Sequence, residues 1–124
     1  MSEYTLYRTD QPKPYFMLKL EYGCGSKEWL IPDNKNLDFR NHKRLAFENI
    51  PPLQRGVEEP HCGSLEMDKG ELELRSETRF KIEFSVRSDT ENYGLNGSYV
   101  LMVPSWGRKT TRRTWVLIPS RGTN

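Results

Sequence analysis

The chain has 124 residues, a net charge of +2 and 35% apolar residues, among them three Trp, six Tyr and five Phe. This length is that of one domain, and the apolar and aromatic content is enough for one core, which excludes two ordinary domains and a disordered chain. No apolar run approaches the roughly 20 residues of a membrane helix, and the first residues do not form a secretory signal. We therefore expect a cytoplasmic protein that does not enter a membrane.

Short runs of alternating apolar and polar residues, separated by turn residues, predict strands along most of the chain. The alternation is clear in Tyr15–Glu21, which puts Phe16, Leu18 and Leu20 on one face. Asp68-Lys69-Gly70 is typical of a tight hairpin turn. The expected strands are Tyr15–Glu21, Lys27–Ile31, Lys43–Asn49, Ser64–Met67, Glu71–Arg75, Phe80–Val86, Gly97–Val103 and Thr114–Ile118.

These strands and the lack of an amphipathic helix predict one mostly β domain, a small antiparallel β-barrel of about eight strands or a sandwich. Residues 1–5 and 120–124 are expected to fray. Trp29 and Trp115 lie within strand runs and are expected in the core. Cys24 and Cys62 are far apart in the sequence, and we expect two free thiols, although a disulfide stays open.

Charge is unevenly distributed along the chain. The segment 48–73 holds seven acidic and two basic residues, whereas 101–124 holds five basic residues and no acidic one. In the loop Pro104–Arg113, Trp106 lies among basic residues, which is the composition of a platform for single-stranded nucleic acid. The basic residues of this loop are Arg108, Lys109, Arg112 and Arg113. A solvated loop is the alternative, and we expect Trp106 to pack back on the barrel.

The order of several short motifs matches a known family. The segment from Glu28 to Ala46 contains EWLIP, LD and KRLA, and it is similar to "SWAVPKGPSLDPxxKRLAVEVEDHP" of the 3′-phosphoesterase domain of bacterial and archaeal DNA ligase D. Further on, GSLEMDKGELEL (63–74) resembles the family's "GTVxxWDxGxxEL". The pieces LNGSYVLMV (95–103) and TWVLI (114–118) resemble its final strands. The resemblance extends from about Tyr4 to Pro119.

The resemblance implies a small β-barrel that trims 3′ ends of DNA or RNA during end joining. Members use a divalent metal, typically manganese, to remove a 3′-phosphate or a terminal ribonucleotide. Ligase, polymerase or Ku components are the partners that the resemblance implies. Such chemistry needs His and Asp as metal ligands, with Arg and His on the scissile phosphate.

Those residue types are missing at the matching positions. The family's first strand reads "LHYDFRLE", whereas this chain has PYFMLKLE. Tyr15 stands in place of the ligand His, Met17 in place of the Asp and Lys19 in place of the Arg, and the upstream His position falls near Thr9. The family's "EDHP" becomes Asn49-Ile50-Pro51-Pro52. Tyr and Met do not replace imidazole and carboxylate around a hard cation, so we expect the catalytic metal site to be lost.

Arg44 matches a phosphate-contacting Arg of the family, and Glu48 stands near one of its acidic residues. Together with Tyr15 and Lys19, Arg44 is expected to hold a phosphate and stack a base. The alternative is a filled cavity in which Lys19 and Arg44 are merely solvated. A relocated metal site of His42, Glu48, His61 and Cys62, with Glu58 and Glu59 nearby, is a weaker hypothesis, because one His-Cys pair is not a ligand motif.

Three functions remain open. The first is a catalytically impaired 3′-phosphoesterase-like domain that binds nucleic-acid 3′ ends or phosphate as a DNA-repair accessory. The second is an active enzyme with a relocated site. The third is a protein-binding barrel, which predicts an exposed apolar patch near Tyr15, Met17 and Ile50.

Overall fold

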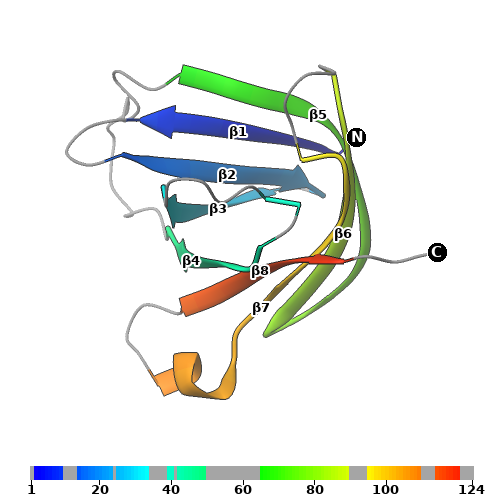
Figure 1. Cartoon of the computed structure of the whole chain (residues 1–124). Helices are drawn as coiled ribbons and strands as arrows, with labels where there is room; N and C mark the ends of the chain where they lie inside the picture. Colours follow the sequence, from blue (N-terminus) through cyan, green and yellow to red (C-terminus); the bar gives the residue numbers. More distant parts are fainter. Residues whose placement is uncertain are drawn as a thin grey trace.

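The computed structural model describes residues 2–9, 14–23, 25–33, 39–40, 42–49, 65–89, 95–109 and 114–120. The elements are β1 (Glu3–Thr9), β2 (Tyr15–Tyr22), β3 (Gly25–Pro32), β4 (Arg44–Glu48), β5 (Leu65–Thr78), β6 (Lys81–Ser88), β7 (Gly97–Met102), the 3-10 helix η1 (Ser105–Lys109) and β8 (Thr114–Ser120) (Figure 1). The strands form one antiparallel sheet closed in a ring, in the order β1-β2-β3-β4-β8-β7-β6-β5. The expected β-barrel of about eight strands is confirmed. No helix in the described part of the chain has the length and apolar character that crossing a bilayer requires.

The ring is closed by β1, which pairs with β2 on one side and with β5 on the other. Tyr4 and Leu6 of β1 are completely buried. The expected fraying of residues 1–5 is therefore wrong for Glu3–Thr5. It is also wrong for Ser120, which pairs with Ser98 of β7, while residues 121–124 lie outside the described ranges. Both strands are held because ring closure gives each of them two neighbours.

The expected hairpin at Asp68-Lys69-Gly70 is wrong, because these residues lie inside the single long strand β5. The first half of β5 pairs with β1 and the second half with β6, so the strand bends around the barrel (Figure 1). Asp68 points into the interior, where it is 2% exposed. A Cβ on Gly70 would collide with the carbonyl of Arg87 on β6. Asp68 and Gly70 are residue types common in turns, but here Gly70 allows β5 and β6 to approach closely and Asp68 makes buried polar contacts.

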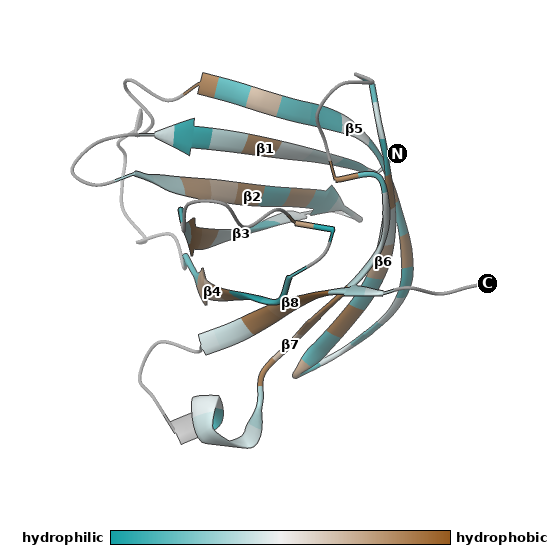
Figure 2. Ribbon diagram, viewed as in Figure 1, coloured by the Kyte–Doolittle hydropathy of each residue, from teal (hydrophilic) through white to brown (hydrophobic). Residues whose placement is uncertain are grey.

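The core fills the inside of the ring, and polar and apolar residues alternate along strands such as β6 (Figure 2). Trp29 and Trp115, from β3 and β8, are buried as expected, with ring centroids 5.5 Å apart and an interplanar angle of 78°. Phe84 and Tyr99, from β6 and β7, stack at 5.8 Å. Edge-to-face and stacked arrangements are both favourable for aromatic rings. The two pairs therefore stabilise the packing of β3 against β8 and of β6 against β7.

The actual turn between β5 and β6 is made by Arg79 and Phe80, since Thr78 and Lys81 are directly paired. The chain then returns along β7 and enters η1, where a loop was expected. Gly107 in η1 donates its backbone N–H to the carbonyl of Pro104 at 2.9 Å. The β5–β6 turn and η1 lie together at the lower end of the barrel in Figure 1.

Candidate nucleic-acid interface

Tyr15, Met17 and Lys19 share the outer face of β2, because Phe16, Leu18 and Leu20 point into the core. Tyr15 and Lys19 are half-buried, whereas Met17 is only 3% exposed. The protein-binding hypothesis predicted an exposed apolar patch here, and this is wrong for Met17. Ile50, which was expected in the same patch, lies outside the described residues.

Lys19 is surrounded by carboxylates on this outer face. Its Nζ lies 3.6 Å from Oε2 of Glu21, and its direct cross-strand neighbour on β3 is Glu28. One lysine beside two glutamates gives this part of the outer face a net negative charge. The outer face of β2 is therefore a poor phosphate site by itself.

Arg44 lies on the other side of the sheet, inside the barrel, where it is 3% exposed. Its guanidinium stands 4.5 Å above the ring of Phe39 and 5.9 Å from that of Phe16. Nη2 donates to the carbonyl of Pro32 at 3.1 Å. The structure therefore does not bring Arg44 together with Lys19 and Tyr15, and the expected three-residue phosphate site does not form.

The placement of Arg44 follows from the pairing of β4. This strand makes only two register pairs with β3, at Trp29 and Leu30, but four with β8. Beyond these two pairs, the side chain of Arg44 extends from β4 to β3 and donates a hydrogen bond to the carbonyl of Pro32. This bond gives a backbone acceptor a partner where the pairing of the two strands has ended. Arg44 is a structural arginine that joins β4 to the end of β3.

Among the residues that the structure describes, no three His, Cys, Asp or Glu side chains come together as a metal site. His42 is exposed, and Oε1 of Glu48 accepts a hydrogen bond from Nε1 of Trp115 at 3.0 Å. The other members of the hypothetical relocated site, His61 and Cys62 with Glu58 and Glu59, lie outside the described ranges. Cys24 lies outside them too.

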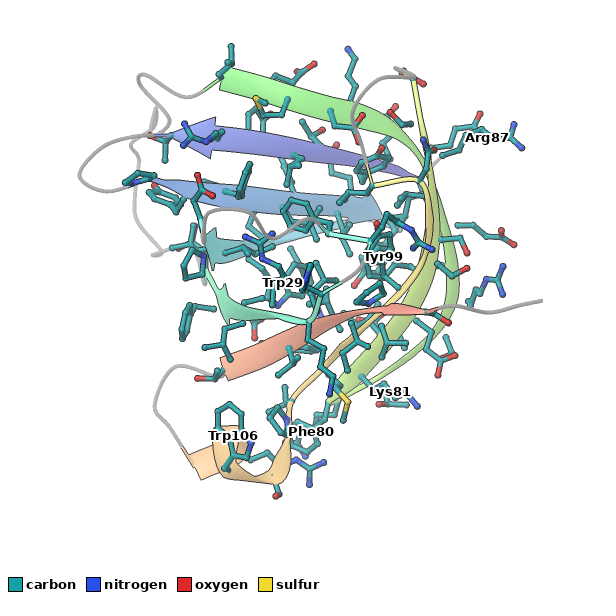
Figure 3. All side chains as sticks on the ribbon, in the orientation of Figure 1. Trp29, Phe80, Lys81, Arg87, Tyr99 and Trp106 are labelled. Atoms are coloured by element: carbon teal, nitrogen blue, oxygen red, sulfur yellow. The ribbon has the colours of Figure 1, made fainter. Side chains whose placement is uncertain are left out.

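A different surface, at the lower end of the barrel, combines aromatic and basic side chains (Figure 3). Trp106 on η1 is 57% exposed, so the expectation that it packs back on the barrel is wrong. A Cβ on Gly107 would lie 2.6 Å from the carbonyl oxygen of Thr114, which shows how closely η1 sits against the start of β8. The close packing of Gly107 fixes η1 in a position where its neighbour Trp106 faces solvent.

Arg108, two residues after Trp106 in η1, lies over the ring of Phe80 with its Cζ 4.2 Å from the ring centroid. Arg79 approaches the same ring at 5.6 Å. Cation–π contacts of this kind are worth about 0.5–1 kcal/mol at exposed sites, enough to bias two flexible side chains towards one arrangement. The side chain of Lys109 is not described, and Arg112 and Arg113 lie outside the described ranges.

No protein-family model matches the chain, and a search of curated proteins finds no match for it. The residues themselves therefore carry the functional argument.

Sequence reasoning missed Arg79 and Phe80 as members of this surface. They are separated from Trp106 by more than 20 residues, and only the pairing of β6 with β7 brings the two segments to the same end of the barrel. The alternation predicts a strand that begins at Phe80 and leaves Arg79 between two expected strands, with the tight turn expected at Asp68-Lys69-Gly70 instead. Because β5 continues unbroken to Thr78, the turn falls at Arg79-Phe80.

Proposed function

We propose that this protein is a 3′-phosphoesterase-like barrel, of the kind found in DNA ligase D, that has lost metal-dependent catalysis and binds nucleic-acid 3′ ends or phosphate as a DNA-repair accessory. The observed ring of eight antiparallel strands agrees with the fold that the resemblance implied. The nonligating Tyr15 and Met17 occupy two ligand positions of the family, which supports the loss of catalysis.

The exposed side chains of Trp106 and Arg108 are the observation that carries the nucleic-acid part of this proposal. The solvent-facing indole of Trp106 offers a stacking surface for a base, and Arg108, two residues later in η1, offers charged donors for a phosphate while its guanidinium lies over the ring of Phe80. The fold gains little stability from a Trp side chain that lies largely in water, whereas burial of such a ring is strongly favourable. The exposure of Trp106 therefore favours a binding role.

The test is equilibrium binding of fluorescently labelled 3′-phosphorylated DNA and RNA oligonucleotides, measured by anisotropy between about 20 and 200 mM salt. Affinity is expected to fall steeply with salt, because phosphate contacts release counterions. Undetectable binding at the lowest salt would refute the proposal. The same measurement on Lys19→Ala tests the outer face of β2, where a small effect is expected because of Glu21 and Glu28.

An active enzyme with a relocated site is distinguished by incubating a 3′-phosphorylated primer with the protein and manganese. The proposal expects no release of phosphate. Turnover that disappears in His61→Ala would establish the enzyme and contradict the loss of catalysis.

A further inference from the structure

Two segments that are distant in the sequence form one surface at the lower end of the barrel. We call it the turn–helix platform and define it by Arg79, Phe80, Lys81, Trp106 and Arg108. The first three come from the β5–β6 turn and the start of β6, and the last two from η1 (Figure 3).

The platform is held in place by contacts between its two segments. The carbonyl of Phe80 accepts a hydrogen bond from the backbone N–H of Val103 at 2.9 Å, two residues before η1 begins. The guanidinium of Arg108 lies over the ring of Phe80. A binding surface that is organised in advance loses less conformational entropy when a ligand binds.

The charge of the platform is positive. Arg79, Lys81 and Arg108 are all exposed, and within the described part of the chain Lys81 alone among them pairs with a carboxylate, Glu83 at 3.1 Å. Three cations and one carboxylate give a net charge of +2 for these four residues. Contact with an aromatic ring does not use the N–H donors of a guanidinium as a carboxylate would, so Arg108 keeps donors for an anion.

We infer that the turn–helix platform binds single-stranded nucleic acid, with a base stacked on Trp106 and neighbouring phosphates on Arg79 and Arg108. This inference rests on the proposed nucleic-acid-binding function, and it specifies that the ligand is single-stranded and that it binds at the platform. An exposed indole stacks on the face of an unpaired base, whereas the base faces inside a duplex are covered by neighbouring base pairs. A protein that bound duplex by charge alone would have no use for the exposed ring.

The platform is separate from the outer face of β2, where the resemblance places 3′-end chemistry. Going around the ring from β2, the strands β3, β4 and β8 come before β7, which leads into η1. In the other direction, β1 and β5 separate β2 from β6. Binding at the platform is therefore expected to need no strand end.

The experiment compares three probes of equal length: a linear oligothymidylate with a 3′-phosphate, a circular oligothymidylate without ends, and a blunt duplex. The linear and circular single strands are expected to bind within about threefold of each other and at least tenfold more tightly than the duplex. Single strands should also quench fluorescence of the exposed Trp106, since Trp29 and Trp115 are buried. Tighter binding to duplex, or binding to the 3′-phosphorylated strand alone, would overturn the inference while leaving nucleic-acid binding in place. No binding to any probe would remove the proposed function as well.

Variants test the assigned residues. Trp106→Ala is expected to weaken single-strand binding at least fivefold, the lower end for stacking of one base, and Trp106→Phe should recover most of the loss. Arg79→Ala and Arg108→Ala should each reduce the slope of log K against log salt by about 0.7, the value for one phosphate contact on a single strand.

Arg87 provides the matched control, because it is exposed and lies at the other end of β6 (Figure 3). Arg87→Ala removes the same charge but should leave the salt slope within about 0.2 of that of the wild-type protein. The inference is wrong if Arg87→Ala weakens binding as much as Arg108→Ala, since that result would indicate net charge alone. Equal affinity of Trp106→Ala and wild-type protein would also refute it.

Discussion

Removal of the Asp68 carboxylate should destabilise the barrel more than removal of any exposed acidic side chain. Asp68 accepts hydrogen bonds from Tyr4 Oη at 2.5 Å, from Ser88 Oγ and from the backbone N–H of Leu95 at 3.0 Å. Asp68→Ala leaves three donors without this acceptor at a site that is 2% exposed. Each buried donor without a partner costs about 1–3 kcal/mol, so a loss of about 3–6 kcal/mol is expected after partial relaxation. This is a large share of the roughly 5–15 kcal/mol that stabilises a typical domain.

The assay is urea unfolding followed by tryptophan fluorescence. With a dependence on urea of about 1–3 kcal/mol/M, a loss of about 3 kcal/mol lowers the midpoint by about 1–3 M. Asp68→Asn keeps one oxygen acceptor and should lose less, about 1–3 kcal/mol. Asp89→Ala, which removes an exposed carboxylate, is the control and should change stability by less than about 0.5 kcal/mol. If Asp68→Ala and Asp89→Ala unfold at the same urea concentration, the buried hydrogen-bond network does not stabilise the protein as argued.

The other predictions concern the buried tryptophans, Tyr4 and Arg44. Trp115→Phe should cost about 1 kcal/mol more than Trp29→Phe, because only the indole N–H of Trp115 has a hydrogen-bond acceptor, Glu48, among the described residues; equal losses in urea unfolding would contradict this. Burial, followed by the hydrogen bond to Asp68, raises the pKa of the Tyr4 phenol. Because only the unfolded state then ionises as the pH rises above about 10, stability should fall by up to about 1.4 kcal/mol per pH unit, and Tyr4→Phe should show a shallower decline in alkaline unfolding curves. Arg44→Met should lose about 1.5–3 kcal/mol of stability, since it removes the hydrogen bond from the charged guanidinium to the carbonyl of Pro32. It should not change the salt slope of oligonucleotide binding, and a changed slope would show that Arg44 contacts the nucleic acid.

The regular strands were predictable because their alternation is strong. Phe80–Val86 puts Ile82, Phe84 and Val86 on one face, and the structure buries all three. Strand β1 was missed for the opposite reason. Its two buried apolar residues, Tyr4 and Leu6, lie close to the N-terminus among polar residues, and nothing local indicates that β5 will pair with them. Tertiary pairing decides such a strand more than its own composition does.

Strand β4 shows how the alternation itself can mislead. Its apolar Leu45 is 45% exposed, while Arg44 and Ala46 point inward. Ala46 pairs directly with Trp115, and Trp115 packs on Trp29, so the small side chain leaves room for the indole pair. The face that β4 turns to the core is set by these large neighbours on adjacent strands, which the sequence of β4 does not contain.

The same distinction between inner and outer faces shows which residues of β2 can change without disturbing the core. The proposed resemblance to the ligase D family expects metal and phosphate ligands at three positions of β2. These positions are Tyr15, Met17 and Lys19, and all three alternate with core residues. A change at Tyr15 or Lys19 would therefore remove no side chain from the interior. Met17 is nevertheless 3% exposed, and an ionised Asp at that position would be costly to bury without a bound cation, whereas a thioether is not. A methionine at this position therefore fits the proposed absence of a metal on this face, and the proposed nucleic-acid surface is the turn–helix platform, which lies away from β2.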